Sequence, residues 1–581
     1  MIQLGRQLIV SHKKLLVMLC LQLSNSICYF ETYERHFLFS QVEKAVIQRV
    51  PTAHLYVVNQ FLDEVIPGMT AFDYRWHEGD FEYSDQEFLI DECTISENFF
   101  HSVYKMKPRY TSLIRSTVGE PKKNTLKTNL ITFENRNFNA DRGCNVGPQD
   151  RLSDLLANLF FDTWVNSAKL KEVQQDILSV SKFHLGEWLD KRTPAAFKKL
   201  KHELHTWRYD PQQQLKYCLM VKSDIKPKLD ESPLYKYMTG QNIIYHNSCV
   251  TAVFSHVFMQ VVARLKYVLN DNICMFHGMD HQDFADEVAL ALGNINAFNA
   301  YELDISKYDK SQAALMKQVE EKILLRLGMH ADLIDCFFCG EYDSLVTMRT
   351  KELQLSVGAQ RRSGGANTWL GNTIIVMVLI AILLDGSKAD FVGVCGDDSI
   401  IFSQQDLKLS LSDLATNYGF DVKLFNHTVP YFCSKYLVQT VDKLYFVPDP
   451  FKLFVKMGVG RTADINKLHE IFMSFVDMTK AMVSDDVIVQ LCHLHERRYG
   501  KAPMAYAAFC VIHILRSNFS QFCRLYYDGD SSVGLVAKRN PSLTMQLRKT
   551  WFESKKKIGN LWRKMHIPFV ERVSEQDLDG F

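Results

Sequence analysis

Two adjacent aspartates in an otherwise apolar segment constrain this chain more than any other feature of its sequence. Asp397 and Asp398 follow Gly396, and apolar residues flank them from Phe391 to Phe402. Such flanks predict two short strands, and glycine can adopt the backbone geometry of a tight turn between them. Two carboxylates beside a core repel each other and lose hydration, so the hairpin needs a compensating charge. A divalent cation would supply it, although a solvated turn also explains these residues when they are taken alone.

A second acidic segment lies upstream of this hairpin. Residues Tyr301–Gln312 have the pattern of a strand that leads into the start of a helix. Asp304 alternates with apolar neighbours and therefore points to the opposite face of the strand, and Asp309 follows after a turn. A third carboxylate at a strand end is what a two-metal site for nucleotidyl transfer needs, because two cations about 3.5–4 Å apart hold the attacking and leaving oxygens. We therefore expect Asp304 to share metal ions with the hairpin.

A segment of small residues precedes a long apolar run between the two acidic segments. The residues of Ser363–Ala366 are all small, which lets a backbone approach a ligand closely. Thr368 and Asn372 are four residues apart, so they project from one face of the helix that is predicted to begin here. The apolar run that reaches Leu384 predicts a buried helix behind a sheet, with its polar start facing the site.

Three of these segments, taken in order, closely resemble the palm motifs of the RNA-dependent RNA polymerases of positive-strand RNA viruses. They are Asp304–Gln312, Gln360–Thr373 and Val394–Phe402. The sequence is most similar to the alphavirus-like superfamily and, within it, to the closterovirus group. Further segments resemble the basic fingers motif, the lysine-bearing motif after the catalytic hairpin and the palm–thumb junction: Leu219–Ser232 with Gln241–Asn247, Tyr418–Phe425, and Pro430–Val438 with Val447–Gly458.

The resemblance implies an α+β fold of the right-hand polymerase type. It has fingers, a palm whose antiparallel sheet packs on helices, and a mostly helical thumb. The implied division is an N-terminal extension of unknown function (1–130), fingers (131–290), palm (291–312 and 360–445), a fingers insertion (313–359), and a thumb with a C-terminal tail (446–581).

The resemblance also implies the catalytic groups. Asp304 and Asp397 would be the main ligands of Mg²⁺, or of Mn²⁺, with Asp398 in support. The 3′-hydroxyl of the growing strand would attack the α-phosphorus of the incoming nucleotide, and the metals would neutralise the developing charge. Lys423 is the expected general acid for the leaving pyrophosphate.

The implied nucleotide site combines polar and basic residues. Asp309 and Asn372 would sense the ribose 2′-hydroxyl, and Ser363 and Thr368 would hold that network or the template nucleotide. Such a network should select NTPs over dNTPs, because a polar site left unpaired penalises the wrong sugar.

Basic residues are expected to complete this site. Lys222, Lys226 and Lys228 would neutralise the triphosphate, although each taken alone is better explained as a solvated surface lysine. Arg361 and Arg362 are predicted to contact RNA or the triphosphate.

The composition is ordinary for a globular protein, with 47% hydrophobic and 23% charged residues. The formal net charge is only +1, so RNA binding requires a locally basic channel. Fourteen cysteines without a disulfide-framework spacing favour a reducing compartment. The segment 548–564 mixes basic and aromatic residues; it could bind the exiting duplex, lie on an anionic membrane or form a solvated thumb helix.

The expected partners are template and product RNA, NTPs and the viral helicase and methyltransferase, which precede the polymerase in the replication polyproteins of the resembled viruses. The chain has no GxxxxGK[ST] phosphate loop of its own, and Met1 need not be the native start. The expected location is the host cytoplasm, in a replication complex attached to membranes through partners or an amphipathic segment.

Two other functions remain open on the sequence. A reverse transcriptase would share the three aspartates, but a bulky gate residue is expected there in place of the pair formed by Asp309 and Asn372. A catalytically inactive RNA-binding scaffold is the alternative from another class, and the intact carboxylates argue against it.

Overall fold

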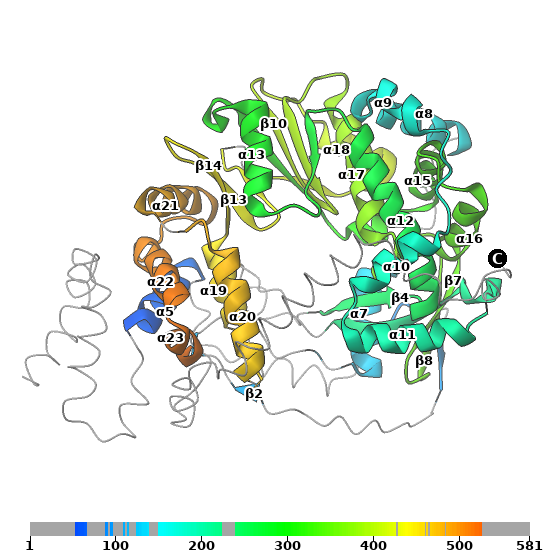
Figure 1. Cartoon of the computed structure of the whole chain (residues 1–581), viewed down its shortest axis with the longest axis horizontal. Coiled ribbons are helices and arrows are strands. Elements are labelled where there is room, and N and C mark those ends of the chain that lie inside the picture. The colour runs from blue at the N-terminus through cyan, green and yellow to red at the C-terminus, as the bar shows by residue number, and fades with distance from the viewer. Residues whose placement is uncertain are drawn as a thin grey trace, which may run out of the picture.

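The protein has a mixed α+β fold, as predicted, in which helices surround several β-sheets (Figure 1). A computed structural model describes residues 53–66, 87–90, 93–96, 109–110, 113–114, 122, 124–138, 149–208, 210–222, 239–425, 428–458, 461–462, 465–482 and 484–525. Lys226, Lys228 and the basic segment 548–564 lie outside the described residues.

The central sheet carries the predicted catalytic hairpin. Its strands stand in the order β11, β6, β10, β9, β5, where only β5 and β9 run parallel. The predicted hairpin is confirmed, since β9 and β10 are antiparallel and Gly396 and Asp397 form the turn between them. The bounds are β5 Ile273–Met275, β6 Asn299–Ile305, β9 Phe391–Cys395, β10 Asp398–Ser403 and β11 Val422–Leu424.

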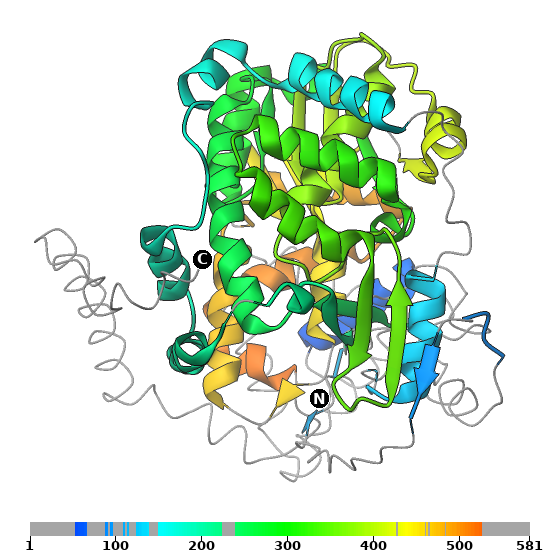
Figure 2. The ribbon, with the colours of Figure 1, turned by 90° about the vertical axis from the view of Figure 1, so that its right-hand side faces the viewer.

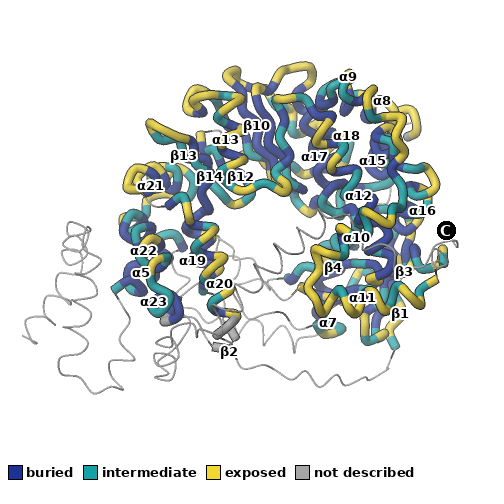
Figure 3. Tube along the Cα trace, in the orientation of Figure 1, coloured by how far each residue is buried: buried dark blue, intermediate teal, exposed yellow. Residues whose placement is uncertain are grey.

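Helix α17 (Thr368–Leu384) covers one face of this sheet. It begins at Thr368, as predicted, and nearly all of its residues are buried. Val392, Val394 and Ile401 of the sheet belong to the same apolar core as α17. Helices α8 (Gln149–Trp164) and α15 (Ala314–Arg326) pack against α17, and α12 (Ser248–Val268) contributes to the same apolar core. Figure 3 shows the strands and α17 as dark, buried elements.

The opposite face of the central sheet packs on a second set of elements. Phe391, Ile400 and Phe402 contact α13 (His281–Leu292) and a three-stranded sheet through a shared aromatic core. That sheet consists of β12 (Tyr431–Phe432), β13 (Lys435–Gln439) and β14 (Leu444–Pro448).

A further five-stranded sheet has the order β1, β8, β7, β3, β4. Strands from the predicted fingers and from the predicted fingers insertion join here, since β3 pairs in parallel with β7. Helix α7 (Leu126–Arg136) packs against β3 and β4. Figure 2 shows β7 and β8 as two long antiparallel green arrows. The strands are β1 Cys93–Ile95, β3 Lys216–Lys222, β4 Gln241–Tyr245, β7 Ser344–Met348 and β8 Leu353–Val357.

Short helices link these layers. They are α9 Ser167–Val173, α10 Lys182–Asp190, α11 Pro194–Thr206, α14 Tyr308–Ser311, α16 Ala331–Tyr342 and α18 Leu411–Tyr418. Among the described residues, α12 is the one helix long and apolar enough to cross a membrane, but 61% of its most apolar window is buried. Packing inside the protein therefore accounts for its composition.

The C-terminal helices form a separate apolar core that includes an N-terminal helix. Helix α5 (Ala53–Val65) lies in the predicted N-terminal extension, yet it packs against α22 and places Phe61 among Phe451, Phe454 and Phe509. The other helices are α19 Pro450–Met457, α20 Ile465–Met478, α21 Asp485–Tyr499, α22 Ala505–Ser517 and α23 Phe519–Arg524. Nearby, β2 (Arg109–Tyr110) pairs with β15 (Arg461–Thr462).

Candidate functional site

The strand register brings the three predicted aspartates to one end of the central sheet. Ser399 pairs with Leu303 across β10 and β6, so the next position in the antiparallel register sets Asp398 opposite Asp304. Asp397 occupies the adjacent turn, and all three residues are exposed. Residues distant in the sequence are thus neighbours on one face of the sheet.

The electrostatics of this end of the sheet favour a cation. Although Asp398 is exposed on its strand, desolvation by the protein around its carboxylate and then the charge of Asp397 raise its pKa to about 6. Carboxylate oxygens are the donors that hard divalent cations prefer. Among the described residues no three His, Cys, Asp or Glu side chains are grouped closely enough to hold a metal ion. The chemistry of the donor set fits a divalent cation, while the ligand geometry is not formed.

The turn between β9 and β10 is attached to α17 through Thr373. The buried Gly396 amide donates a hydrogen bond of 2.9 Å to Thr373 Oγ1, and that hydroxyl donates to the Trp369 carbonyl at 2.8 Å. Gly396 has a φ of +64°, which disfavours residues with a Cβ. Sequence reasoning missed Thr373, although it lies four residues after Trp369 on the helix that the sequence predicted.

The predicted ribose-sensing pair is in direct contact. Asn372 Nδ2 donates to Asp309 Oδ1 at 3.0 Å. Burial raises the pKa of Asp309, and the hydrogen bond from Asn372 opposes that rise. The contact agrees with the expectation that these two side chains act together.

The two predicted hydroxyl residues bond to the backbone. Thr368 Oγ1 donates to the Arg362 carbonyl at 2.7 Å, which closes the loop before α17. Ser363 Oγ donates to the Asn242 carbonyl at 2.8 Å and accepts from the Ile244 amide, which ties this loop to β4. Both hydroxyls therefore shape the loop that leads to Asn372.

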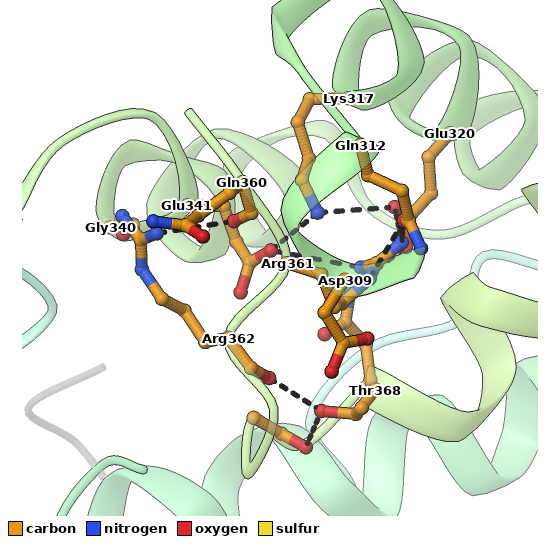
Figure 4. Close-up of polar contacts among 12 residues, drawn as sticks. Asp309, Gln312, Lys317, Glu320, Gly340, Glu341, Gln360, Arg361, Arg362 and Thr368 are labelled. Carbon is orange, nitrogen blue, oxygen red and sulfur yellow. Dashed lines mark hydrogen bonds and ion pairs between the residues drawn. The ribbon is translucent and has the colours of Figure 1, made fainter. Parts of the chain in front are cut away.

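The prediction that Arg361 and Arg362 contact RNA or the triphosphate is wrong, because both side chains are fully buried and bonded inside the protein. Arg361 forms an ion pair of 2.6 Å with Glu320 (Figure 4). Arg362 donates to backbone carbonyls of the neighbouring loops and helix: Gly340, Val357, Gly358 and Gln360.

The predicted lysines are only partly brought to the site. Lys423 lies directly opposite Asp304 across β11 and β6 and is exposed, so it stands beside the carboxylates. Lys222 is exposed at the end of β3, in the other five-stranded sheet.

Two further lysines lie near Asp398, and sequence reasoning did not single them out. Burial lowers the pKa of Lys435 and of Lys452, while the negative charge of Asp398 opposes both shifts. Lys435 Nζ donates to the Cys433 carbonyl at 3.0 Å, and Lys452 Nζ donates to Ser434 Oγ at 3.2 Å. Both lysines are thus held at the turn between β12 and β13. Their positions in two segments already assigned to the palm–thumb junction were the available signal.

A strand-end carboxylate set, a glycine turn and a polar helix start on an α+β fold are the parts that a two-metal nucleotidyl-transferase site needs. The comparisons with known proteins identify the family. A family model described as RNA dependent RNA polymerase matches residues 83–525, well over half of the chain. The chain belongs to this family.

Curated relatives agree with this assignment. Replicase polyprotein 1ab of grapevine leafroll-associated virus 3 is 54% identical over 517 residues, covering 89% of this chain and 19% of that protein. Replicase polyprotein 1ab of beet yellows virus is 35% identical over 492 residues, covering 82% and 16%. The methyltransferase/helicase/RNA-directed RNA polymerase of raspberry bushy dwarf virus is 28% identical over 403 residues, covering 68% and 23%.

These relatives confirm the predicted resemblance to positive-strand RNA virus polymerases and to the closterovirus group. The chain spans less than a quarter of the length of each of these three relatives.

Proposed function

We propose that this chain is the RNA polymerase part of a viral replicase, which copies an RNA template with NTPs by two-metal nucleotidyl transfer. The observation that carries the proposal is the register that sets Asp398 opposite Asp304, with Asp397 in the adjoining turn. In this reading the palm (291–312 and 360–445) supplies β6, β9, β10 and β11 of the central sheet, and its fifth strand, β5, comes from the segment assigned to the fingers. The second five-stranded sheet belongs to the fingers, and the C-terminal helices are the thumb.

Polymerases of this family use divalent metal ions, and we propose Mg²⁺, with Mn²⁺ as the alternative. Asp304 and Asp397 would hold the ions and Asp398 would support them, because their oxygens are hard donors that repel one another without a cation. When bound, the ions lower the pKa of the attacking hydroxyl and neutralise charge on the phosphate oxygens.

The remaining steps belong to the side chains of the protein. Lys423 would give a proton to the leaving pyrophosphate, a role that its register position opposite Asp304 supports. Asp309, which accepts from Asn372, would accept from the ribose 2′-hydroxyl with its other oxygen. Lys222, Lys226 and Lys228 would meet the triphosphate as point charges.

The proposal extends to partners and location. Template RNA, product RNA and NTPs are the substrates. Helicase and methyltransferase activities would come from other parts of the same replicase, since the raspberry bushy dwarf virus relative is named for all three activities. The proposed location is a membrane-associated replication complex in the host cytoplasm.

Primer extension on a homopolymeric RNA template tests the proposal. The wild-type chain should extend the primer with NTPs, should lose activity on addition of a chelator, and should regain it with excess Mg²⁺. Asp397→Ala should abolish extension, whereas Asp271→Asn, at an exposed acid paired with Lys169, should leave extension unchanged. A preference for dNTPs would indicate a reverse transcriptase. Activity that survives Asp397→Ala would refute the mechanism, and RNA binding without extension by the wild-type chain would indicate a scaffold.

A further inference from the structure

A charged cluster without solvent access lies directly behind the pair formed by Asp309 and Asn372. Arg361 and Glu320 approach to 2.6 Å, Lys317 and Glu341 to 2.6 Å, and each of these side chains is at most 1% exposed. Cross contacts of 3.7 Å (Arg361 with Glu341) and 4.0 Å (Lys317 with Glu320) join the two ion pairs. Moving four charges out of water costs free energy even when their signs balance, so we expect the cluster to have a role beyond stability.

The cluster is connected to Asn372 by hydrogen bonds of fixed direction. Figure 4 shows Arg361, Gln312 and Glu320 of this network. Arg361 Nη2 donates to Gln312 Oε1 at 2.7 Å, and Gln312 Nε2 donates to Asn372 Oδ1 at 2.8 Å. Arg361 Nε also donates to Asn372 Oδ1, at 3.1 Å. A guanidinium group can only donate, so the amide of Gln312 must turn its oxygen to Arg361 and its nitrogen to Asn372. The oxygen of Asn372 is thereby occupied, and only its NH₂ group can face Asp309.

The helix that carries Asn372 is shaped to admit this ion pair. A Cβ at Gly371 would lie 2.3 Å from Glu320 Oε1 and 2.5 Å from two Arg361 nitrogens. Glycine inside a helix is unfavourable, so the position accommodates close approach at a cost in helix propensity. Asn367 Nδ2 also donates to Glu320 Oε1, at 2.8 Å. The Arg361–Glu320 pair is therefore fixed against the backbone of α17, next to the residue whose amide it orients.

We propose that Arg361 and Gln312 are positioning residues that determine ribose specificity, because they fix the orientation of the Asn372 amide. With this orientation Asp309 receives a hydrogen bond from Asn372 and directs its other oxygen to the 2′-hydroxyl. Without Arg361 and Gln312 the Asn372 amide can rotate and turn its oxygen toward the Asp309 carboxylate. Both groups are then acceptors, so no hydrogen bond forms between them. The inference rests on the proposed recognition of ribose by Asp309 and Asn372.

Single-nucleotide incorporation kinetics on the full chain test the proposal, with UTP and dUTP compared on the same primed template. The readout is the ratio of kcat/KM for UTP to kcat/KM for dUTP. Gln312→Leu and Arg361→Lys should each lower this ratio about tenfold, the factor associated with losing one well-formed hydrogen bond. The change should come mainly from a higher KM for UTP. A destabilised variant loses active enzyme equally for both nucleotides, so instability alone does not alter the ratio.

Matched controls come from the neighbouring buried residues. Gln360→Leu changes a buried glutamine whose Oε1 has no hydrogen-bond partner among the described residues. Arg362→Lys changes an equally buried arginine that bonds to backbone carbonyls. Both controls should keep the wild-type ratio, whatever their stability.

A second substitution at Gln312 and the variant Asn372→Ala distinguish a failure of the positioning role from a failure of ribose recognition. Gln312→Glu retains the size of the side chain and the acceptor for Arg361, but the ionised carboxylate cannot donate to Asn372, so the ratio should again fall. If Asn372→Ala lowers the ratio while the variants at Gln312 and Arg361 keep it, the positioning role is refuted and ribose recognition stands. If Asn372→Ala itself keeps the wild-type ratio, the proposed recognition of ribose by this pair is refuted.

Discussion

Replacing Thr373 with valine should show whether its hydroxyl positions the proposed catalytic turn, apart from any effect on the stability of the fold. Valine matches the shape of threonine but has no hydroxyl to accept the Gly396 amide. Thr373 is 0% exposed and Gly396 is buried, so water cannot substitute for the lost acceptor without a local rearrangement.

The size of the effect follows from this geometry. A buried amide left without a partner costs about 1–3 kcal/mol in the free energy of unfolding. The turn can recover a partner only by moving, and Asp397 moves with it. Because a displacement of about 1 Å at a reacting group can lower a rate about 10²-fold, we expect kcat to fall by about 10- to 100-fold. The KM for NTP should change little, since Asp309 and Asn372 remain in place.

Thr373→Ser is the matched control. It keeps the hydroxyl and removes one buried methyl group, which costs about 1 kcal/mol in unfolding free energy. Urea unfolding should therefore show both variants destabilised, whereas primer extension at saturating NTP should show a reduced kcat for valine alone. Equal kcat values for the two variants would show that the Thr373 hydroxyl does not position the turn.

The remaining predictions concern charge, space and protonation. Asp397→Asn should reduce kcat by about 10³-fold. It should also lower the pKa of Asp398 from about 6 toward its ordinary value, which NMR titration of the metal-free protein would measure. An unchanged pKa would contradict the repulsion between Asp397 and Asp398. Gly371→Ala should destabilise the protein by about 1–3 kcal/mol in urea unfolding, because the new Cβ meets Glu320 and Arg361. Gly186→Ala should stabilise it by about 0.5–1 kcal/mol, because a Cβ at this helical position has nothing within 4 Å. Changes of the same sign in the two variants would be inconsistent with this packing. Burial of His495 lowers its pKa to about 4, below its unfolded value of about 6.5, so its neutral form supports the fold at neutral pH and up to about 3 kcal/mol is lost as pH falls from 6.5 toward 4. His495→Leu should reduce this pH dependence in urea unfolding, and an identical dependence in both proteins would exclude it.

The sequence predicted the parts of the site that depend on local patterns. Alternation placed Asp304 on the face opposite its apolar neighbours, and the apolar flanks of Gly396 predicted the hairpin that the structure contains. Helical spacing put Asn372 on the polar start of α17, and Asp309 is its hydrogen-bond partner. The family resemblance supplied the pairing of these two residues, which spacing alone does not reveal.

The roles of Arg361 and Arg362 could not be predicted from local sequence patterns. Arginine is a common phosphate-binding residue, so the sequence favoured a contact of both side chains with RNA or the triphosphate. Arg361 is buried against Glu320 and Glu341, which lie on α15 and α16 within a predicted fingers insertion that carried no site signal. Arg362 is buried against backbone carbonyls, among them those of Gly340 and Val357. An ion pair between segments distant in the sequence leaves no periodic pattern, so only the tertiary structure reveals it.

The packing of α5 bears on where this protein can be divided. The family match begins at residue 83, after α5 has ended at Val65. Nevertheless Phe61 fills the C-terminal helical core, and Glu64 accepts a hydrogen bond of 2.7 Å from the Met504 amide, 440 positions along the chain. The boundary of the family match is therefore not the boundary of the cooperative folding unit. A fragment that starts at residue 83 would leave the helices around Phe509 with an open apolar pocket, and such a fragment should aggregate more readily than one that retains residues 53–66.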